Sequence, residues 1–151
     1  MDSVEEVLAR AKQRARELNL SYAGALLPEE AYALQQAVPG AAMVDVRTQA
    51  EWYWVGRVPG AAMIEWTTFP GGTRNPDFLA QLRSAVPPTN APVMFICRSG
   101  QRSHHAAALA TEAGYANCFN VLEGFEGDRD QRNHRNSVNG WRVAGLPWEQ
   151  G

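Results

Sequence analysis

The sequence predicts a single three-layer α/β/α domain built around a central, mostly parallel sheet. Short apolar runs, typical of buried parallel strands, alternate with segments of helical character, and no internal repeat or low-complexity tract interrupts them. The 151 residues suffice for one core, and 45% hydrophobic with 20% charged residues is too apolar a composition for a disordered chain. We therefore expect helices to cover both faces of the sheet.

The N-terminal residues predict a helix that precedes the main domain. Ser3 and Glu6 have the spacing of a capping box, and apolar side chains recur at helical intervals from residue 4 to residue 18. The opposite face carries three arginines and is expected to be solvated: Arg10, Arg14 and Arg16. We divide the chain into an N-terminal helical extension, residues 1–21, and one domain, residues 22–151.

Helices and strands alternate through that domain. Pro28 suits the first turn of a short helix. Four short apolar runs are predicted strands: residues 42–46, 62–64, 93–96 and 118–122. Three segments have helical features: a turn begun by the capping-box pair Thr48 and Glu51, residues 76–85, and residues 104–113 before Gly114. Residues 124–140 are polar and turn-rich, and they predict a surface loop of marginal order.

The composition excludes several classes of protein. A formal net charge of −2 gives no reason to expect nucleic-acid binding without sequence preference. No stretch approaches the roughly 20 apolar residues of a membrane helix, and the acidic N-terminus lacks the apolar core of a secretory signal. Two cysteines, Cys97 and Cys118, cannot build a disulfide framework. We expect a cytoplasmic protein that binds neither nucleic acid nor membrane.

Cys97 is the strongest candidate for a reactive residue. It follows the fully apolar strand 93–96 and precedes a helix that we expect to start near residue 102 or 103. Parallel sheets bind ligands at the carboxyl ends of their strands, where helix N-termini offer free N–H groups and partial positive charge. Arg98 and Arg102 add positive charge that favours a thiolate. A free cysteine can also be an inert core residue, but packing alone gives no reason for two flanking arginines.

The chain resembles the rhodanese family of sulfurtransferases. Four segments carry the resemblance in the family's order: residues 45–52 (DVRTQAEW), 56–61 (GRVPGA), 97–103 (CRSGQRS) and 144–147 (AGLP). The similarity extends from about Tyr22 to Pro147, and it implies a rhodanese-like domain over residues 22–151. One departure is Arg57, which stands where family members commonly have histidine and adds a fixed positive charge near the pocket.

The resemblance implies a single-domain thiosulfate sulfurtransferase that needs no cofactor and no metal. Cys97 would take the outer sulfur from thiosulfate or a similar small anionic donor as a persulfide, and pass it to cyanide or a thiol acceptor. Protein donors or acceptors are also possible partners. The persulfide cradle and donor-binding residues implied are Arg98, Ser99, Gly100, Gln101, Arg102 and Ser103. A possible surrounding shell consists of Asp45, Arg47 and Arg57.

Three alternatives stay open. One is a persulfide carrier or sensor that acts only with protein partners. Another is a phosphatase-type enzyme, although related phosphatases place five residues between cysteine and arginine, and here four separate Cys97 from Arg102. A third is a non-catalytic interaction domain. The physiological donor and acceptor, the pathway and the oligomeric state cannot be deduced from the sequence.

Other conspicuous residues are given structural roles. Asp45 is expected to accept N–H groups in the following turn, and Arg47 to form an ion pair or anchor a loop. His104 and His105 point about 100° apart on a helix and cannot share a metal. Cys118 is expected to pack in the core. The basic residues of the polar loop form either a solvated surface or a partner-docking surface: Arg129, Arg132, His134 and Arg135.

Overall fold

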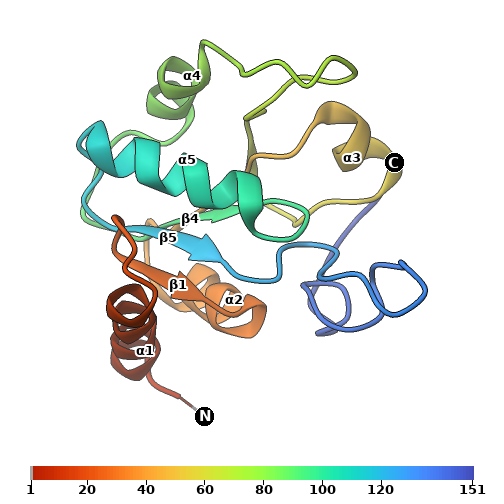
Figure 1. The fold of residues 1–151 in the computed structure, drawn as a ribbon. Helices are drawn as coiled ribbons and strands as arrows, with labels where there is room; N and C mark the ends of the chain where they lie inside the picture. Colours follow the sequence, from red (N-terminus) through yellow and green to blue (C-terminus); the bar gives the residue numbers. More distant parts are fainter. Residues whose placement is uncertain (1) are drawn as a thin grey trace.

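Five parallel strands form one sheet in the computed structural model, which describes residues 2–151 (Figure 1). The strand order is β1-β5-β4-β2-β3, so β4 lies at the centre. The strands are β1 (Gly24–Leu26), β2 (Ala42–Asp45), β3 (Ala62–Met63), β4 (Val93–Ile96) and β5 (Cys118–Val121). The sheet and its helices confirm the predicted α/β fold class.

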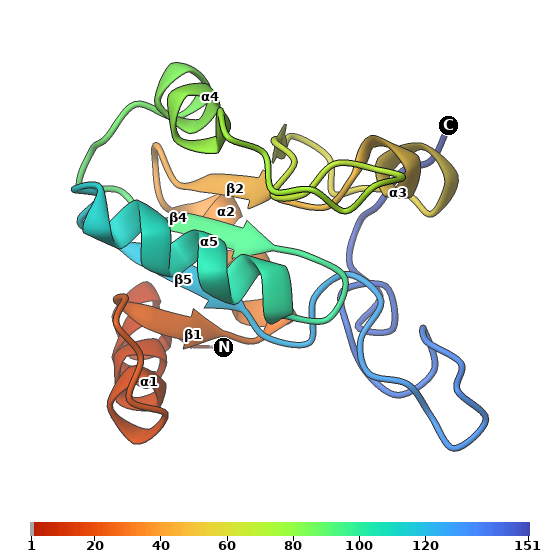
Figure 2. The ribbon, with the colours of Figure 1, turned by 45° about the horizontal axis from the view of Figure 1, so that its top comes forward.

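Helices cover both faces of this sheet. The helices are α1 (Val4–Glu17), α2 (Pro28–Ala37), α3 (Gln49–Trp54), α4 (Phe78–Ala85) and α5 (Gln101–Glu112). α1 and α2 pack on one face, and α4 and α5 pack on the other. The arrowheads of the long strands point to the side where α3 and the C-terminal segment lie (Figure 2).

The core is divided by the sheet into two apolar clusters. Along β4, Val93 and Phe95 belong to the cluster under α4 and α5, while Met94 and Ile96 belong to the cluster over α1 and α2. All four side chains are at most 2% exposed, which explains why this strand is continuously apolar. Each buried side chain of this size stabilises the fold by about 1.5–3 kcal/mol relative to exposure.

The N-terminal helix agrees with its predicted start but not with its predicted solvated face. Ser3 and Glu6 form the capping box through reciprocal hydrogen bonds of 3.1 and 3.2 Å. Arg14 donates to Glu30 on α2 at 2.6 Å and to the Ala25 carbonyl at 2.9 Å, so this arginine joins α1 to the domain. Burial acts to raise the pKa of Glu30, but the hydrogen bonds it accepts lower it overall.

The sequence prediction missed one strand and placed the start of one helix too late, and several other element ends differ by one or two residues. β1 is missed because three residues give no periodicity, and its identity depends on pairing with β5. Gly24 is required there, since a Cβ atom would lie 2.7 Å from the Ala11 carbonyl carbon. α5 begins at Gln101, earlier than expected, because Gly100 turns the chain with a φ of +106° immediately before it.

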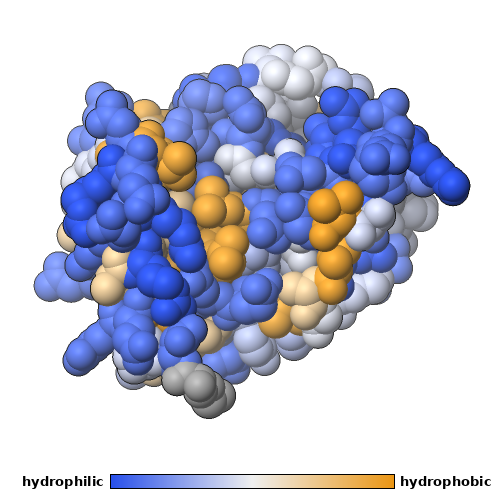
Figure 3. Space-filling view, turned by 60° about the horizontal axis from the view of Figure 1, so that its bottom comes forward, coloured by the Kyte–Doolittle hydropathy of each residue, from blue (hydrophilic) through white to orange (hydrophobic). Residues whose placement is uncertain are grey.

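The α1–α2 side of the molecule carries separate apolar patches between hydrophilic side chains (Figure 3). A hollow of about 480 Å³ between the two helices is lined in part by Val4, Val7, Tyr32 and Leu34. It lies across the sheet from α5, and so it is separate from the loop that follows β4. Across residues 2–151, none of the helices has the length and hydropathy to span a bilayer.

Candidate active site

Cys97 lies at the carboxyl end of the central strand and is only 1% exposed. The Gly100 N–H donates a hydrogen bond of 3.2 Å to Cys97 Sγ, so the loop folds back over the sulfur. Ser103 Oγ lies 3.2 Å from the same sulfur on the other side. The three residues place a thiol in a small polar enclosure at the edge of an apolar core.

The N-terminus of α5 faces this enclosure. The helix has 12 residues and begins at Gln101, directly after the left-handed Gly100. Its first-turn N–H groups have no acceptor within the helix, and they carry the positive end of the helix dipole. The backbone at this point therefore offers hydrogen-bond donors and partial positive charge to an anionic group bound beside Cys97.

Asn120 on β5 is a site residue that the sequence analysis missed. Its Nδ2 donates to the Gly100 carbonyl at 3.2 Å, and its Oδ1 accepts from Ser103 Oγ at 2.6 Å. The Gly100 carbonyl can only accept, which fixes the orientation of the amide and directs the single Ser103 hydroxyl proton to Asn120. The sequence contained an indication of this role, because Asn120 is the one amide in an otherwise apolar strand.

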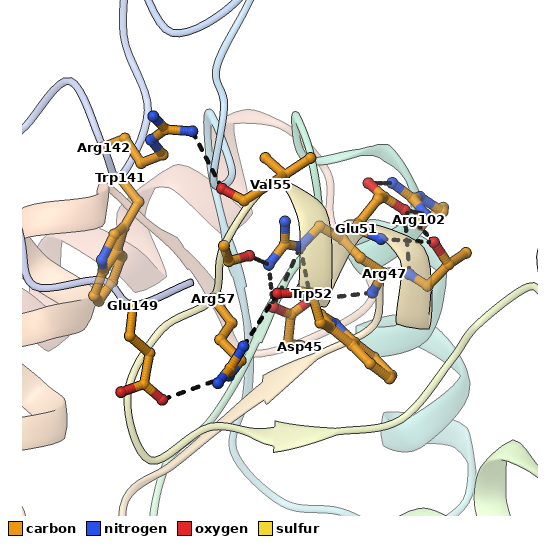
Figure 4. A network of polar contacts seen from close by, with 12 residues as sticks. Asp45, Arg47, Glu51, Trp52, Val55, Arg57, Arg102, Trp141, Arg142 and Glu149 are labelled. Atoms are coloured by element: carbon orange, nitrogen blue, oxygen red, sulfur yellow. Dashed lines mark hydrogen bonds and ion pairs between the residues drawn. The ribbon is translucent and has the colours of Figure 1, made fainter. Parts of the chain in front are cut away.

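Arg102 forms an ion pair and does not point freely at the sulfur. Its two terminal nitrogens bind the two carboxylate oxygens of Glu51 at 2.8 and 2.9 Å (Figure 4). Glu51 is also held by the N–H and hydroxyl of Thr48, the cap of α3. Burial acts to raise the pKa of Glu51, but the hydrogen bonds and charge of Arg102 lower it overall. This bidentate pair anchors the Cys97 loop to α3.

The other predicted loop residues face outward to different degrees. Arg98 and Gln101 are exposed, while Ser99 is half-buried. Arg98 lines a hollow of about 820 Å³ beside the loop, together with Arg102, Trp54 and Phe69. Trp54 and Phe69 are 72% and 66% exposed, so the hollow opens widely to solvent.

Asp45 and Arg47 form a fully buried ion pair beneath the site. The Asp45 carboxylate accepts from the Arg47 backbone N–H at 3.1 Å and from its guanidinium at 2.6 Å. Arg47 also donates to the Gly56 carbonyl at 2.8 Å and lies 4.3 Å from the centre of the Phe125 ring. Both predicted structural roles match these contacts: Asp45 caps a turn and Arg47 anchors a loop.

Arg57 is not brought to the Cys97 loop. Its side chain pairs with Glu149 at 3.4 Å and donates to the Trp52 carbonyl (Figure 4). It also donates to the carbonyl of Gly151. It lines a different hollow from Arg98 and Arg102. The positive charge that the sequence suggested near the pocket is instead used to hold the C-terminal residues.

The segment after β5 supports the loop from behind. Phe125 N–H donates to the Cys97 carbonyl at 2.8 Å, and Glu126 N–H donates to the Arg98 carbonyl at 3.0 Å. Gly124 has a φ of +68°, and a Cβ atom there would lie 2.6 Å from the Arg98 carbonyl. Only glycine allows this approach without displacing the loop.

The polar segment 124–140 is more tightly held than the expected loop of marginal order. Asp130 accepts hydrogen bonds from the N–H groups of Arg132 and His134 and from the Ser137 hydroxyl. Phe125 is fully buried at the start of the segment. Local turn bonds of this kind involve side chains and backbone, so apolar periodicity does not reveal them.

The remaining conspicuous residues lie outside the Cys97 enclosure. Cys118 begins β5 in the core, and burial raises the pKa of its thiol to about 11. His104 Nδ1 lies 2.6 Å from the Tyr22 hydroxyl. In the part of the chain that the structure describes, no three His, Cys, Asp or Glu side chains gather as metal ligands. Trp52, Trp66 and Trp141 are buried.

Known proteins share both the fold and the sequence pattern. The model of the Rhodanese-like domain matches residues 27–131. The crystal structure of Rv0390 from M. tuberculosis has a TM-score of 0.78 and 47% identity, covering 87% of this chain and 100% of that one. Uncharacterized protein RC0915 of Rickettsia conorii is 37% identical over 121 residues, which are 80% of this chain and 92% of that protein.

Some relatives have a stated activity. Thiosulfate sulfurtransferase GlpE of Pseudomonas entomophila is 30% identical over 99 residues, which are 66% of this chain and 78% of that protein. The family model covers well over half of the 151 residues and includes the Cys97 loop and its Asn120 partner. The chain therefore belongs to the rhodanese-like domain family.

Proposed function

We propose that this chain is a sulfurtransferase in which Cys97 carries sulfur as a persulfide between a small anionic donor and a nucleophilic acceptor. The observation that carries the proposal is the enclosure of Cys97 Sγ by the Gly100 N–H at the N-terminus of α5. Family membership supports the same chemistry, because a relative is named a thiosulfate sulfurtransferase. Thiosulfate is our candidate donor.

In the first half-reaction the Cys97 thiolate attacks the outer sulfur of thiosulfate. A sulfur–sulfur bond forms to Cys97 while the bond between the two thiosulfate sulfurs breaks, and sulfite leaves with the electron pair. Charge is conserved, since a monoanion and a dianion give a persulfide monoanion and a sulfite dianion. In the second half-reaction cyanide or a thiolate takes the outer sulfur and regenerates the thiolate.

The loop stabilises the anionic states of Cys97 by its geometry. The Gly100 N–H already contacts the sulfur, and the first turn of α5 supplies further N–H groups and partial positive charge. Arg102 acts by holding the loop against α3 through Glu51, while Arg98 is exposed to an incoming anion. Neither a metal nor an organic cofactor is required for this transfer.

The ion pair of Arg102 also favours this proposal over a phosphatase-type reaction. A phosphate-binding loop needs its arginine directed at the bound oxyanion. Here both terminal nitrogens of Arg102 are bound to Glu51, and only four residues separate Cys97 from Arg102. The enclosure is therefore better suited to a single sulfur than to a tetrahedral phosphate.

Mass spectrometry of the intact protein after incubation with thiosulfate tests the proposal. We expect an added mass of one sulfur atom, and its removal by cyanide with release of thiocyanate. The Cys97→Ser variant should take up no sulfur, while Cys118→Ser should be labelled like the wild type. Absence of the adduct, or its persistence in Cys97→Ser, would refute a Cys97 persulfide.

The acceptor determines whether the chain is a general enzyme or a dedicated carrier. We place the reaction in a reducing compartment such as the cytoplasm, where thiol acceptors are abundant. The wide hollow of about 820 Å³ beside Arg98 supports access for acceptors larger than cyanide. Comparing discharge of the loaded protein by cyanide, by glutathione and by a reduced protein dithiol distinguishes the two roles.

A further inference from the structure

The Cys97 loop offers one guanidinium group that no carboxylate engages. Arg102 is bound to Glu51 through both terminal nitrogens, so its charge is largely compensated. Arg98 forms no ion pair with any of residues 2–151, and it lines the hollow beside the loop. A dianionic donor, however, is best held by more than one positive group.

Arg135 brings a second guanidinium to the same hollow from the polar segment after β5. Its Nη1 donates to the Gly127 carbonyl at 2.6 Å, and the Gly127 N–H donates to the Arg98 carbonyl at 3.2 Å. One residue thus connects the side chain of Arg135 to the backbone of Arg98. Both arginines line the hollow of about 820 Å³.

The charges around Arg135 are not balanced by the protein. Burial lowers the pKa of Arg135, and the positive charges of Arg98 and Arg129 lower it further. Glu126 also lines the hollow, but its carboxylate and that of Asp128 have a smaller opposite effect. Two arginines that line the same open hollow and repel each other form a site that an anion would stabilise.

We propose that Arg98 and Arg135 together bind the oxyanion end of the sulfur donor, with Arg135 as a residue that selects dianionic donors. This inference rests on the proposed function, because it assumes that Cys97 accepts sulfur from an anion. It gives the 124–140 segment a direct part in donor binding. The sulfonate oxygens lie between the two guanidinium groups, and the outer sulfur faces the Cys97 loop.

Steady-state kinetics with thiosulfate and cyanide test the inference through the Arg135→Ala variant. The value of kcat/KM for thiosulfate reports sulfur loading, and that for cyanide reports discharge. We expect the former to fall about tenfold or more, mainly through KM, because a charged hydrogen bond to the donor is lost. The value for cyanide should stay within about twofold of the wild type.

Arg132→Ala is the matched control. It removes the same charge from the same segment, but Arg132 is exposed and does not line the hollow. We expect its kcat/KM for thiosulfate to remain within about twofold of the wild type. Equal losses in the two variants would overturn the inference, since they would reflect the overall charge of the segment and not a site.

Two further measurements separate donor binding from a structural role. Arg135→Lys keeps the positive charge, so its loss should be smaller than that of Arg135→Ala; equal losses would point to the bond with Gly127 and overturn the inference. With methanethiosulfonate, a monoanionic donor, the penalty of Arg135→Ala should also be smaller than with thiosulfate. An equal penalty for both donors would contradict selection by charge.

The persulfide assay keeps this inference distinct from the proposed function. If wild-type protein forms no Cys97 adduct with thiosulfate, the proposed function fails and the arginine site fails with it. If wild type and Arg135→Ala load sulfur with the same dependence on thiosulfate concentration, the proposed function stands and only the arginine site is wrong. If Arg135→Ala loads sulfur fully but needs a higher thiosulfate concentration for half-saturation than the wild type, both the proposed function and the arginine site are supported.

Discussion

Cys97 and Cys118 differ far more in surroundings than in burial. They are 1% and 0% exposed, and both belong to the apolar cluster under α4 and α5. Cys97 follows the last residue of β4, whereas Cys118 is the first residue of the neighbouring β5 and pairs with Val93 at the start of β4. The two thiols therefore lie at opposite ends of two neighbouring parallel strands.

Under the proposed function, the reactivity of a cysteine depends on which end of a strand it occupies. At the carboxyl end, Cys97 meets the N–H of Gly100 and the start of α5. At the other end, burial raises the pKa of the Cys118 thiol to about 11. Burial is common to both residues, so the contacts at the carboxyl end of β4 distinguish the sulfur carrier proposed above from a packing residue.

Replacing each cysteine by alanine has the largest expected effect among the tests of this contrast. Cys97→Ala should reduce sulfur transfer to background, because the attacking sulfur is gone. Cys118→Ala should retain transfer within about twofold and lower the free energy of unfolding by about 1–2 kcal/mol, because a buried group is truncated. Thiocyanate release and urea unfolding measure the two effects. Loss of transfer in Cys118→Ala with an intact fold would break the contrast.

Arg102→Ala tests how much the anchor of the Cys97 loop contributes at the carboxyl end of β4. We expect about a tenfold loss of transfer, since the loop loses its bidentate anchor on α3 and Glu51 is left without its partner. Arg57→Ala removes an equal charge that binds the C-terminal residues, and it should cost about threefold or less. Similar losses in both variants would contradict a specific role of Arg102 in anchoring the Cys97 loop.

Asn120→Ala tests how the chemistry of Cys97 is controlled from β5. Without the amide, the Ser103 hydroxyl proton is free to turn toward Cys97 Sγ and stabilise the anionic sulfur. The midpoint of the pH dependence of sulfur loading should move to lower pH by about half to one unit. Asn117→Ala, at the opposite edge of the sheet, is the control. An unchanged midpoint in Asn120→Ala would exclude this role.

The acid stability of the Arg102–Glu51 pair gives the smallest expected effect. The pKa of Glu51 is lowered in the folded protein, so the pair contributes fully above the ordinary value of 4.5 and is lost as the pH falls below it. Wild type should exceed Glu51→Gln in stability by about 1 kcal/mol at pH 7, and this difference should become smaller as the pH is lowered from 7 to 3. Urea unfolding at both pH values measures this, and a constant difference would contradict it.

Much of the fold could be predicted from the sequence because its strands are apolar on both faces. Residues 93–96 were correctly predicted as a strand, and the predicted strand 118–122 contains β5, which ends at Val121. The capping boxes at Ser3 and Thr48 mark the starts of α1 and α3. β1 was missed, since its three residues become a strand only by pairing with β5. Pairing across the chain leaves no local pattern.

The site was predictable where its residues are neighbours in sequence and not where they meet through the fold. Cys97, Gly100 and Ser103 were grouped in the sequence analysis, and the structure brings them into contact. Asn120 reaches the same enclosure from another strand, and Arg57 turns away to Glu149. Both depend on contacts between distant segments, which a local motif does not encode.

The hydrogen bonds behind the loop have a consequence for transplanting the site. Because a peptide unit is planar and trans, fixing the carbonyls of Cys97 and Arg98 on one side turns the N–H groups of Arg98 and Ser99 to the other. The residues that fix them, Phe125 and Glu126, come from a different part of the chain. A designer who moved residues 97–103 alone into another α/β protein would therefore carry over the cysteine without the orientation of its dipoles.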